Sequence, residues 1–166
     1  MQTFLTNSNY EKSAQALDNR RLRKQTWECK QILEAVIANR IGEKRGWQSH
    51  CITRMWQNHP HSLLCYWAAM VRECAVRGLN GFAVINDDDY PILLEKEKPA
   101  PDFVYDKRIK SAYRAHLLAK DFSHYSQFGW TEQPKSGYYA PNIHGEWVLY
   151  SGGDDTGKKL NQIACK

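Results

Sequence analysis

The pattern of hydrophobic and polar residues predicts helices along most of the chain. Asn9 or Ser8 can cap a first helix, and Asp18 can cap a segment that runs to about Asn39. We therefore expect residues 10 to 39 to form either one bent helix or two. Placing residues about 100° apart on this segment puts five apolar side chains on one arc, which must face the core. These are Leu22, Cys29, Ile32, Leu33 and Val36.

Two further long helices are predicted later in the chain. Pro60 suits the first turn of a helix that continues to the terminating Gly78, and another helix runs from about Lys107 to Phe128. Residues 79 to 106 contain an Asn-Gly pair, three consecutive aspartates and the prolines of KPAPD, which are typical of a loop.

These elements predict an all-α protein, in which three main helices joined by long loops form a single compact domain. A length of 166 residues is sufficient for one domain with a real core. Residues 147 to 150, which precede Gly152-Gly153, indicate a small β-hairpin near the C-terminus.

The net charge of +5 is modest, but it is unevenly distributed. Residues 1 to 46 carry nine Lys or Arg against five acids, and residues 107 to 135 carry six against two, whereas residues 87 to 106 are acidic. Basic faces suit a polyanion such as nucleic acid. Solvated helix faces explain the same charge pattern equally well.

The composition disfavours several classes of protein. No stretch approaches the roughly eighteen consecutive apolar residues of a membrane span, and the N-terminal residues lack a signal peptide pattern, so we expect no membrane association and a cytoplasmic location. The five cysteines are an odd number and form no Cys-x-x-Cys pair, which disfavours a disulfide framework or a zinc site. We expect no metal and no cofactor.

A polar line borders the apolar arc of the first long helix. Arg21, Lys24, Glu28 and Gln31 fall together there, with Glu28 beside the apolar Cys29. Partial burial raises the pKa of a carboxylate and neighbouring cations lower it, so Glu28 is a candidate for acid/base chemistry. Alternatively, Lys24 and Glu28 form a simple surface pair that contributes a few tenths of a kcal/mol.

A dense aromatic and polar cluster follows in the segment GWQSHCITRMWQNHPH, which also predicts a helical turn at residues 52 to 57. Arg54 could contact a phosphate while Trp47 and Trp56 stack on bases. Alternatively both tryptophans pack in the core, which we favour for Trp56.

The third long helix carries polar side chains of a different kind. His116 is expected to be a satisfied core histidine rather than a metal ligand. Tyr113, Arg114 and Lys120 are candidate DNA contacts, with a solvated helix face as the alternative.

Three segments resemble a known family in the same order, and they span roughly residues 10 to 130. They are SAQALDNRRLRKQTWECKQILEAV, MVRECAVRGLN and AYRAHLLAKDFSHYSQFG. The family is that of the phage pyrimidine-dimer DNA glycosylases, also called endonuclease V enzymes. The start Met-Gln-Thr-Phe-Leu and the pattern Leu-Asp-x-x-Arg-Leu-x-Lys-Gln are closer still to a more distant set of phage and bacterial proteins named after these glycosylases.

The resemblance implies a single helical domain that binds damaged double-stranded DNA, kinks it, displaces a base and attacks the sugar carbon with the N-terminal amine. An imine forms, and Glu28 occupies the position of the catalytic glutamate that assists base release and strand cleavage. A Schiff base divides one difficult displacement into easier steps. Tyr125, Phe128 and Trp130 are suited to stacking on displaced bases. We expect a monomer, located in the host cytoplasm if it is encoded by a phage.

The chain departs from the family pattern at several positions. Gln2 is too large for ordinary removal of the initiator methionine, so Met1 would supply the amine. Trp27 and Gln31 replace two arginines of the family, and Arg21 and Lys24 could replace part of the lost phosphate contact. The full set of predicted nucleic-acid contacts is Gln2, Arg20, Arg21, Lys24, Gln31, Arg54, Tyr113, Arg114, Lys120, Tyr125, Phe128 and Trp130.

The resemblance also divides the chain, with a helical glycosylase-like part at residues 1 to 130 and a C-terminal extension at residues 131 to 166 that packs on the same domain. Three hypotheses for function remain. The first is a base-excision enzyme that uses Met1 and Glu28, with AP-lyase activity. The second is an enzyme of the same fold that acts on another nucleotide or base without an imine. The third is a non-catalytic nucleic-acid-binding protein.

Overall fold

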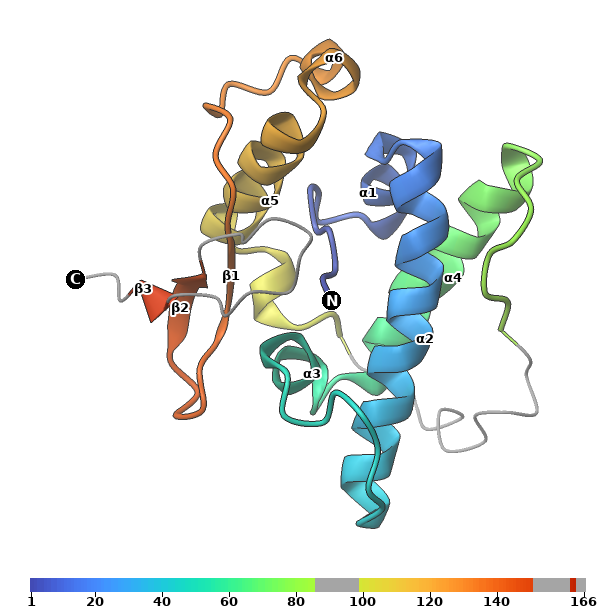
Figure 1. Cartoon of the computed structure of the whole chain (residues 1–166), viewed down its shortest axis with the longest axis vertical. Helices are drawn as coiled ribbons and strands as arrows, with labels where there is room; N and C mark the ends of the chain where they lie inside the picture. The colour runs from blue at the N-terminus through green and yellow to red at the C-terminus, as the bar shows by residue number, and fades with distance from the viewer. Residues whose placement is uncertain (86–98, 151–161, 164–166) are drawn as a thin grey trace.

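The computed structural model describes residues 1–85, 99–150 and 162–163, and most of them are helical (Figure 1). The α-helices are α1 (Tyr10–Ala16), α2 (Asn19–Ile41), α3 (Cys51–Trp56), α4 (Pro60–Val76), α5 (Lys107–Lys120) and α6 (Phe122–Tyr125). Short 3-10 helices lie at η3 (Asp102–Val104) and η4 (Ser126–Phe128), and the strands are β1 (Tyr138–Pro141), β2 (Trp147–Tyr150) and β3 (Gln162–Ile163). The mostly helical fold is confirmed. Among the helices described, none has the length and apolar character of a membrane span.

The first predicted helical segment consists of two helices. Asn9 caps α1 by accepting a backbone hydrogen bond from its first turn, and Asp18 caps α2 by accepting one from the backbone N–H of Arg21. Leu17 between them is extended, with φ −75° and ψ 141°, which breaks the helix. Helix α2 ends at Ile41, and the next residue, Gly42, has a left-handed φ of 74° that suits glycine.

The prediction of one continuous helix from Lys107 to Phe128 is wrong. Asp121 leaves the helical conformation, with φ −159° and ψ 82°, and separates α5 from α6. Its side chain accepts a hydrogen bond from the backbone N–H of His124 and so caps α6. An aspartate that bonds the local backbone in this way competes with helix continuation. The predicted loop of residues 79 to 106 lies partly outside the described residues.

The core forms where α2 packs along α4, with α1 also packed against α4 (Figure 1). All five residues of the predicted apolar arc of α2 are fully buried, so that prediction is confirmed. Trp56 and Trp67 are fully buried as well. The expectation that Trp56 is a core residue is therefore confirmed.

A small antiparallel sheet of order β1-β2-β3 follows the helices. Tyr138 pairs with Tyr150 and Ala140 pairs with Val148, so the predicted hairpin is confirmed, while β3 was not predicted. Strand β1 packs against α3 and α5, and its Tyr138 is buried in the common core.

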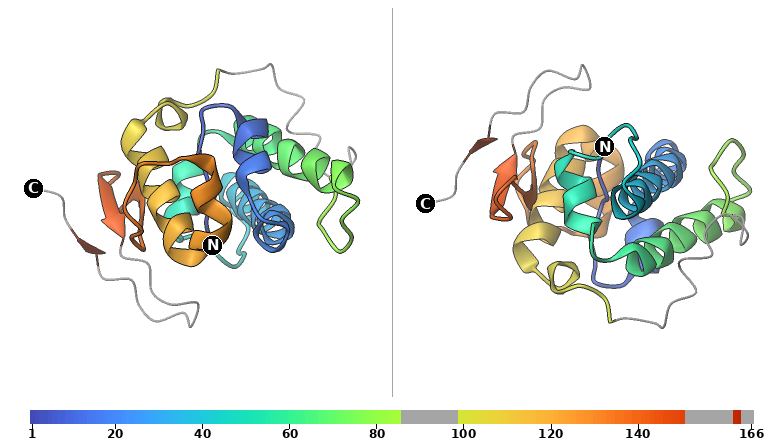
Figure 2. Two further views of the ribbon diagram at one scale, coloured as in Figure 1. Left: turned by 90° about the horizontal axis from the view of Figure 1, so that it is seen from above. Right: turned by 90° about the horizontal axis from the view of Figure 1, so that it is seen from below.

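The N-terminal segment also enters the core. Residues 3 to 6 are buried, and Figures 1 and 2 show this segment between α2 and α5. An irregular segment can be buried only if its backbone groups find hydrogen-bond partners. Side chains from the surrounding helices provide these partners, and they determine where the N-terminal amine lies.

Candidate active site

The N-terminal amine lies beside the carboxylate of Glu28. The Met1 nitrogen is 3.9 Å from Glu28 Oε1, and the backbone N–H of Gln2 donates to Glu28 Oε2 at 3.4 Å. The side chain of Glu28 is 12% exposed and that of Met1 is 2% exposed. The two predicted catalytic groups, which are far apart in the sequence, are therefore brought together at the edge of the core.

Gln25 holds the backbone that leads to this amine. Its Nε2 donates to the carbonyl oxygen of Gln2 at 2.7 Å, and its Oε1 accepts from the backbone N–H of Phe4 at 3.2 Å. Gln25 is fully buried. The sequence analysis missed this residue, although its position three residues after Leu22 and four before Cys29 places a polar side chain on the apolar arc. A polar residue on the apolar arc was therefore the sequence feature that could have identified Gln25.

Two further helices fix the same segment. The indole N–H of Trp56 on α3 donates to Thr3 Oγ1 at 3.1 Å, and Arg114 Nε on α5 donates to the carbonyl oxygen of Thr6 at 3.0 Å. Arg114, predicted as a DNA contact, therefore has a structural bond as well. With Gln25 on α2, three helices position the first six residues.

The predicted polar line divides into two parts. Lys24 Nζ lies 3.8 Å from Glu28 Oε1, with the lysine side chain 63% exposed. Arg21 instead pairs with Asp18 at 2.6 Å and lies over the ring of Tyr125, with 5.6 Å between the guanidinium carbon and the ring centroid. An ion pair as exposed as that of Lys24 contributes little stability, so little free energy holds this lysine beside Glu28.

His50 is a further titratable group on which the charge of the amine acts. It caps α3, and its Nδ1 accepts from the backbone N–H of Ile52 at 3.2 Å. Burial is the main cause that lowers the pKa of His50 to about 4, and the positive charges of the Met1 α-ammonium and Arg54 lower it further. The imidazole is therefore neutral at physiological pH.

An aromatic cluster lies at α6 and η4. It consists of Tyr125, Phe128 and Trp130, with ring centroids 5.8 Å apart for Tyr125 and Trp130 and 5.2 Å apart for Phe128 and Trp130. Arg114 lies over the Trp130 ring at 5.7 Å. Phe128 is 39% exposed, whereas Tyr125 is buried and its hydroxyl donates to Asp18 Oδ2 at 2.6 Å. The structure thus joins the three predicted stacking residues, with Phe128 the most accessible of them.

The remaining predicted contacts occupy different environments. Arg20 and Gln31 are exposed on α2, and Gln2 and Lys120 are half-buried. Tyr113 is fully buried in the core, where it cannot touch DNA, so we do not retain it as a contact.

Arg54 donates to the carbonyl oxygens of Ser49 and Pro141, which links the start of α3 to β1. His116 is a core histidine as expected, and its Nδ1 accepts from the backbone N–H of Gly137 at 3.1 Å. Cys29 is fully buried, which raises the pKa of its thiol, so it is a packing residue.

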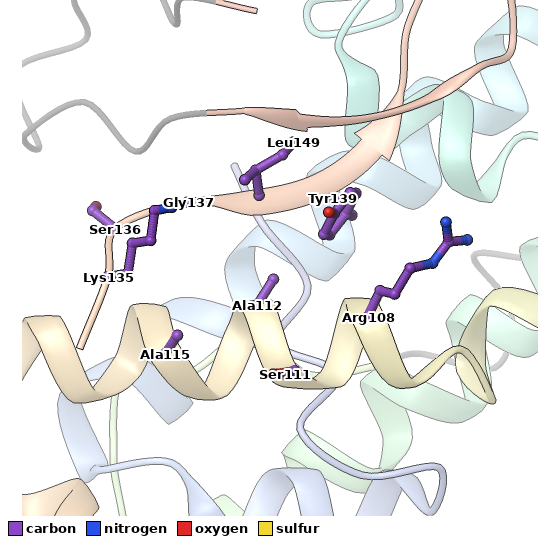
Figure 3. Close-up of a pocket in the computed structure, with 9 residues that line it drawn as sticks. All are labelled: Arg108, Ser111, Ala112, Ala115, Lys135, Ser136, Gly137, Tyr139 and Leu149. Carbon is purple, nitrogen blue, oxygen red and sulfur yellow. The ribbon is translucent and has the colours of Figure 1, made fainter. Parts of the chain in front are cut away.

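A separate hollow of about 300 Å³ lies between α5 and strands β1 and β2 (Figure 3). Ala112 and Ala115 of α5, with Tyr139 and Leu149 of the strands, provide its apolar surface. Arg108 at its end is ion-paired with Asp106 at 2.7 Å, and its guanidinium carbon lies 5.9 Å from the centroid of the Tyr139 ring (Figure 3). None of the residues around the N-terminal amine lines this hollow.

A mostly helical domain with basic faces and an amine beside a partly buried carboxylate has the features expected of a DNA-acting enzyme. The model of the family described as pyrimidine dimer DNA glycosylase matches residues 1–86 of the 166-residue chain. The chain belongs to this family of DNA glycosylases. The matched part includes Met1, Glu28 and α1 to α4. No curated protein and no solved structure matches the chain significantly.

Proposed function

We propose that the protein excises a damaged or modified base from double-stranded DNA, with a pyrimidine dimer as the first substrate to test, through an imine formed by the Met1 amine. One observation carries the proposal. The Met1 nitrogen lies 3.9 Å from Glu28 Oε1, close to the hydrogen-bond reach that joint acid/base chemistry requires. Apo distances of this kind commonly shorten when substrate binds.

In the proposed reaction the neutral amine nitrogen forms a bond to C1′ of the damaged nucleotide. The glycosidic C–N bond breaks, and its electron pair leaves with the base, which takes up a proton. The nitrogen then loses a proton and forms a double bond to C1′, while the C1′–O4′ bond opens and O4′ takes up a proton. The product is a protonated imine. Hydrolysis releases the enzyme, whereas loss of a C2′ proton and elimination of the 3′ phosphate cleaves the strand.

Glu28 is the proposed acid/base group in these steps. Its Oε1 faces the amine and its Oε2 accepts from the next backbone N–H, so the carboxylate is oriented by both oxygens. It is suited to accept the proton that the amine loses and to stabilise the positive charge of the imine. Its low exposure strengthens both interactions.

DNA would be bound by exposed cations on α2 and by the aromatic cluster at α6 and η4. Arg20 and Lys24 are the proposed phosphate contacts and Phe128 the proposed stacking residue, and the exposure of all three side chains supports these roles. We also propose that residues 131 to 166 belong to the same domain as residues 1 to 130. The contacts of β1 with α3 and α5 support this.

A second candidate is an enzyme that uses Glu28 to activate water and forms no imine. The low exposure of Met1 and its ion pair with Glu28 favour this reading, because an amine held in an ion pair is less available as a nucleophile. The two candidates predict opposite effects of blocking the amine.

The deciding experiment is borohydride trapping on duplexes that carry a cyclobutane pyrimidine dimer or an abasic site, with the adduct mapped by mass spectrometry. We expect a covalent adduct on the N-terminal peptide, lost after selective acetylation of the amine and strongly reduced by Glu28→Gln. Glu34→Gln is the matched control, because Glu34 lies on the same helix but pairs with Arg45 at 2.6 Å.

Base release that survives acetylation without an adduct would support the water mechanism. Tight, salt-dependent DNA binding without any base release, unaltered by Glu28→Gln, would identify a non-catalytic binding protein.

A further inference from the structure

Trp47 has an unusual backbone conformation for a tryptophan. It lies in the connection between α2 and α3, with φ 71°, and is the only non-glycine residue with a positive φ among the residues that the structure describes. Its side chain is 54% exposed. A bulky residue in this region is strained, and such strain persists where the surroundings impose it, commonly at functional sites.

The Trp47 ring is supported by His50. The two rings pack edge to face, with centroids 5.6 Å apart and an interplanar angle of 76°, and the backbone N–H of His50 donates to the Trp47 carbonyl oxygen at 3.0 Å. His50 is itself fixed as the cap of α3. The indole is therefore held against a fixed imidazole rather than free to rotate.

His50, which supports the Trp47 ring, caps the helix that holds the N-terminal segment, since Trp56 of α3 donates to Thr3 Oγ1 at 3.1 Å. The Met1 α-ammonium is one of the charges that act on His50, and Figures 1 and 2 show α3 next to the N-terminus. The Trp47 ring is thus linked to the surroundings of the amine through His50.

Core packing does not explain Trp47. Trp56 and Trp67 are fully buried and each donates its indole N–H to a protein oxygen, whereas more than half of the Trp47 side chain is open to solvent. A strained backbone that presents an exposed ring gains little from the hydrophobic effect. An exposed, supported aromatic face is the feature that stacks on unpaired nucleic-acid bases.

We propose that Trp47 is a base-stacking residue of this site, whose ring packs on the base next to the lesion and stabilises the opened duplex beside the Met1 amine. This assignment rests on the proposed function, because it requires that the site opens damaged DNA. Stacking of this kind tolerates any sequence, since every base has a π-face. Trp47 would therefore contribute to lesion binding without selecting the neighbouring base.

The test compares Trp47→Asn and Trp47→Phe with the wild type. Asparagine removes the ring but tolerates the left-handed conformation, and phenylalanine restores an aromatic face. Tyr105→Ala is the matched control, because Tyr105 is a similarly exposed aromatic residue (58%) that follows η3. The probe is a duplex with a tetrahydrofuran abasic analogue, which cannot form an imine, and with 2-aminopurine beside it.

We expect Trp47→Asn to weaken binding of this probe by on the order of tenfold to one hundredfold, the range for loss of one base–aromatic stack. The affinity for undamaged duplex and the melting temperature should not fall, and the 2-aminopurine signal of base opening should decrease. Trp47→Phe should recover most of the affinity, and Tyr105→Ala should bind as the wild type.

Unchanged probe affinity in Trp47→Asn would overturn the inference. So would a lowered melting temperature with equal losses on damaged and undamaged duplex, since the ring would then be structural. Because the probe excludes imine chemistry, failed borohydride trapping with an intact Trp47 effect would count against the proposed mechanism alone. Successful trapping without a Trp47 effect would count against this inference alone.

Discussion

Replacing Gln25 by leucine tests whether a single buried amide positions the amine. Leucine is close to glutamine in size, but it leaves the carbonyl oxygen of Gln2 and the N–H of Phe4 without the partners they have at 2.7 and 3.2 Å. Each unsatisfied buried backbone group costs about 1–3 kcal/mol. Gln2 is only half-buried, so we expect the free energy of unfolding to fall by about 2–4 kcal/mol in total.

Gln25→Leu should reduce the rate of imine formation more than it reduces the affinity for DNA. Release of residues 2 to 4 lets the amine move away from Glu28, and a displacement of about 1 Å at a reacting group can cost on the order of one hundredfold in rate. The assay measures the single-turnover rate of borohydride trapping on an abasic duplex, the affinity for the tetrahydrofuran probe and the free energy of unfolding in urea.

Thr26→Val is the matched control for Gln25→Leu. Thr26 is also buried on α2, and its Oγ1 accepts from the backbone N–H of Ala83 at 2.9 Å, so its loss leaves a comparable buried group unpaired in a different segment. We expect a similar loss of stability with a trapping rate close to that of the wild type. A folded Gln25→Leu protein that traps at the wild-type rate would refute the assigned role of Gln25.

Three other predictions concern stability. Burial raises the pKa of Asp18, but hydrogen bonds from Tyr125 and Arg21 outweigh burial and lower this pKa from 3.8 to about 2. Asp18→Asn should therefore lower the free energy of unfolding by about 2 kcal/mol at neutral pH. In urea denaturation this difference should disappear as the pH falls from about 4 to 2. The pKa of His50 is lowered from 6.5 to about 4, so protonation of this residue favours the unfolded state. The free energy of unfolding of the wild type should therefore fall by about 3 kcal/mol as the pH is lowered from 6.5 to 4. His50→Asn keeps a side chain that can cap the helix, and it should lack this pH dependence. Arg77 donates to two carbonyl oxygens at the C-terminal end of α1, at 2.7 and 2.9 Å. Arg77→Lys should therefore lower the free energy of unfolding by about 1–3 kcal/mol. An unchanged melting temperature would contradict this prediction.

The sequence alone determined the features that depend on neighbouring residues. The spacing of apolar side chains correctly identified the buried arc of α2, and the cap residues Asn9 and Asp18 were found because capping involves residues two or three positions apart. Strand β2 of the hairpin was found from a short apolar run before a glycine pair, whereas its partner β1 was not. Glu28 was selected as a candidate because it is a carboxylate at the margin of that arc.

Tertiary structure decided which residues meet. Met1 and Glu28 are brought together by contacts that no local pattern encodes, chiefly the two hydrogen bonds of Gln25 to a segment more than twenty positions away. Tyr113 was predicted as a DNA contact on the surface of its helix, but the packing of α5 buries it. A helical pattern indicates which face of a helix is apolar, whereas the depth of each side chain depends on the neighbouring elements. The sequence thus determined the main helical segments, though not the break at Asp121, and a candidate carboxylate, and the fold placed the amine beside it.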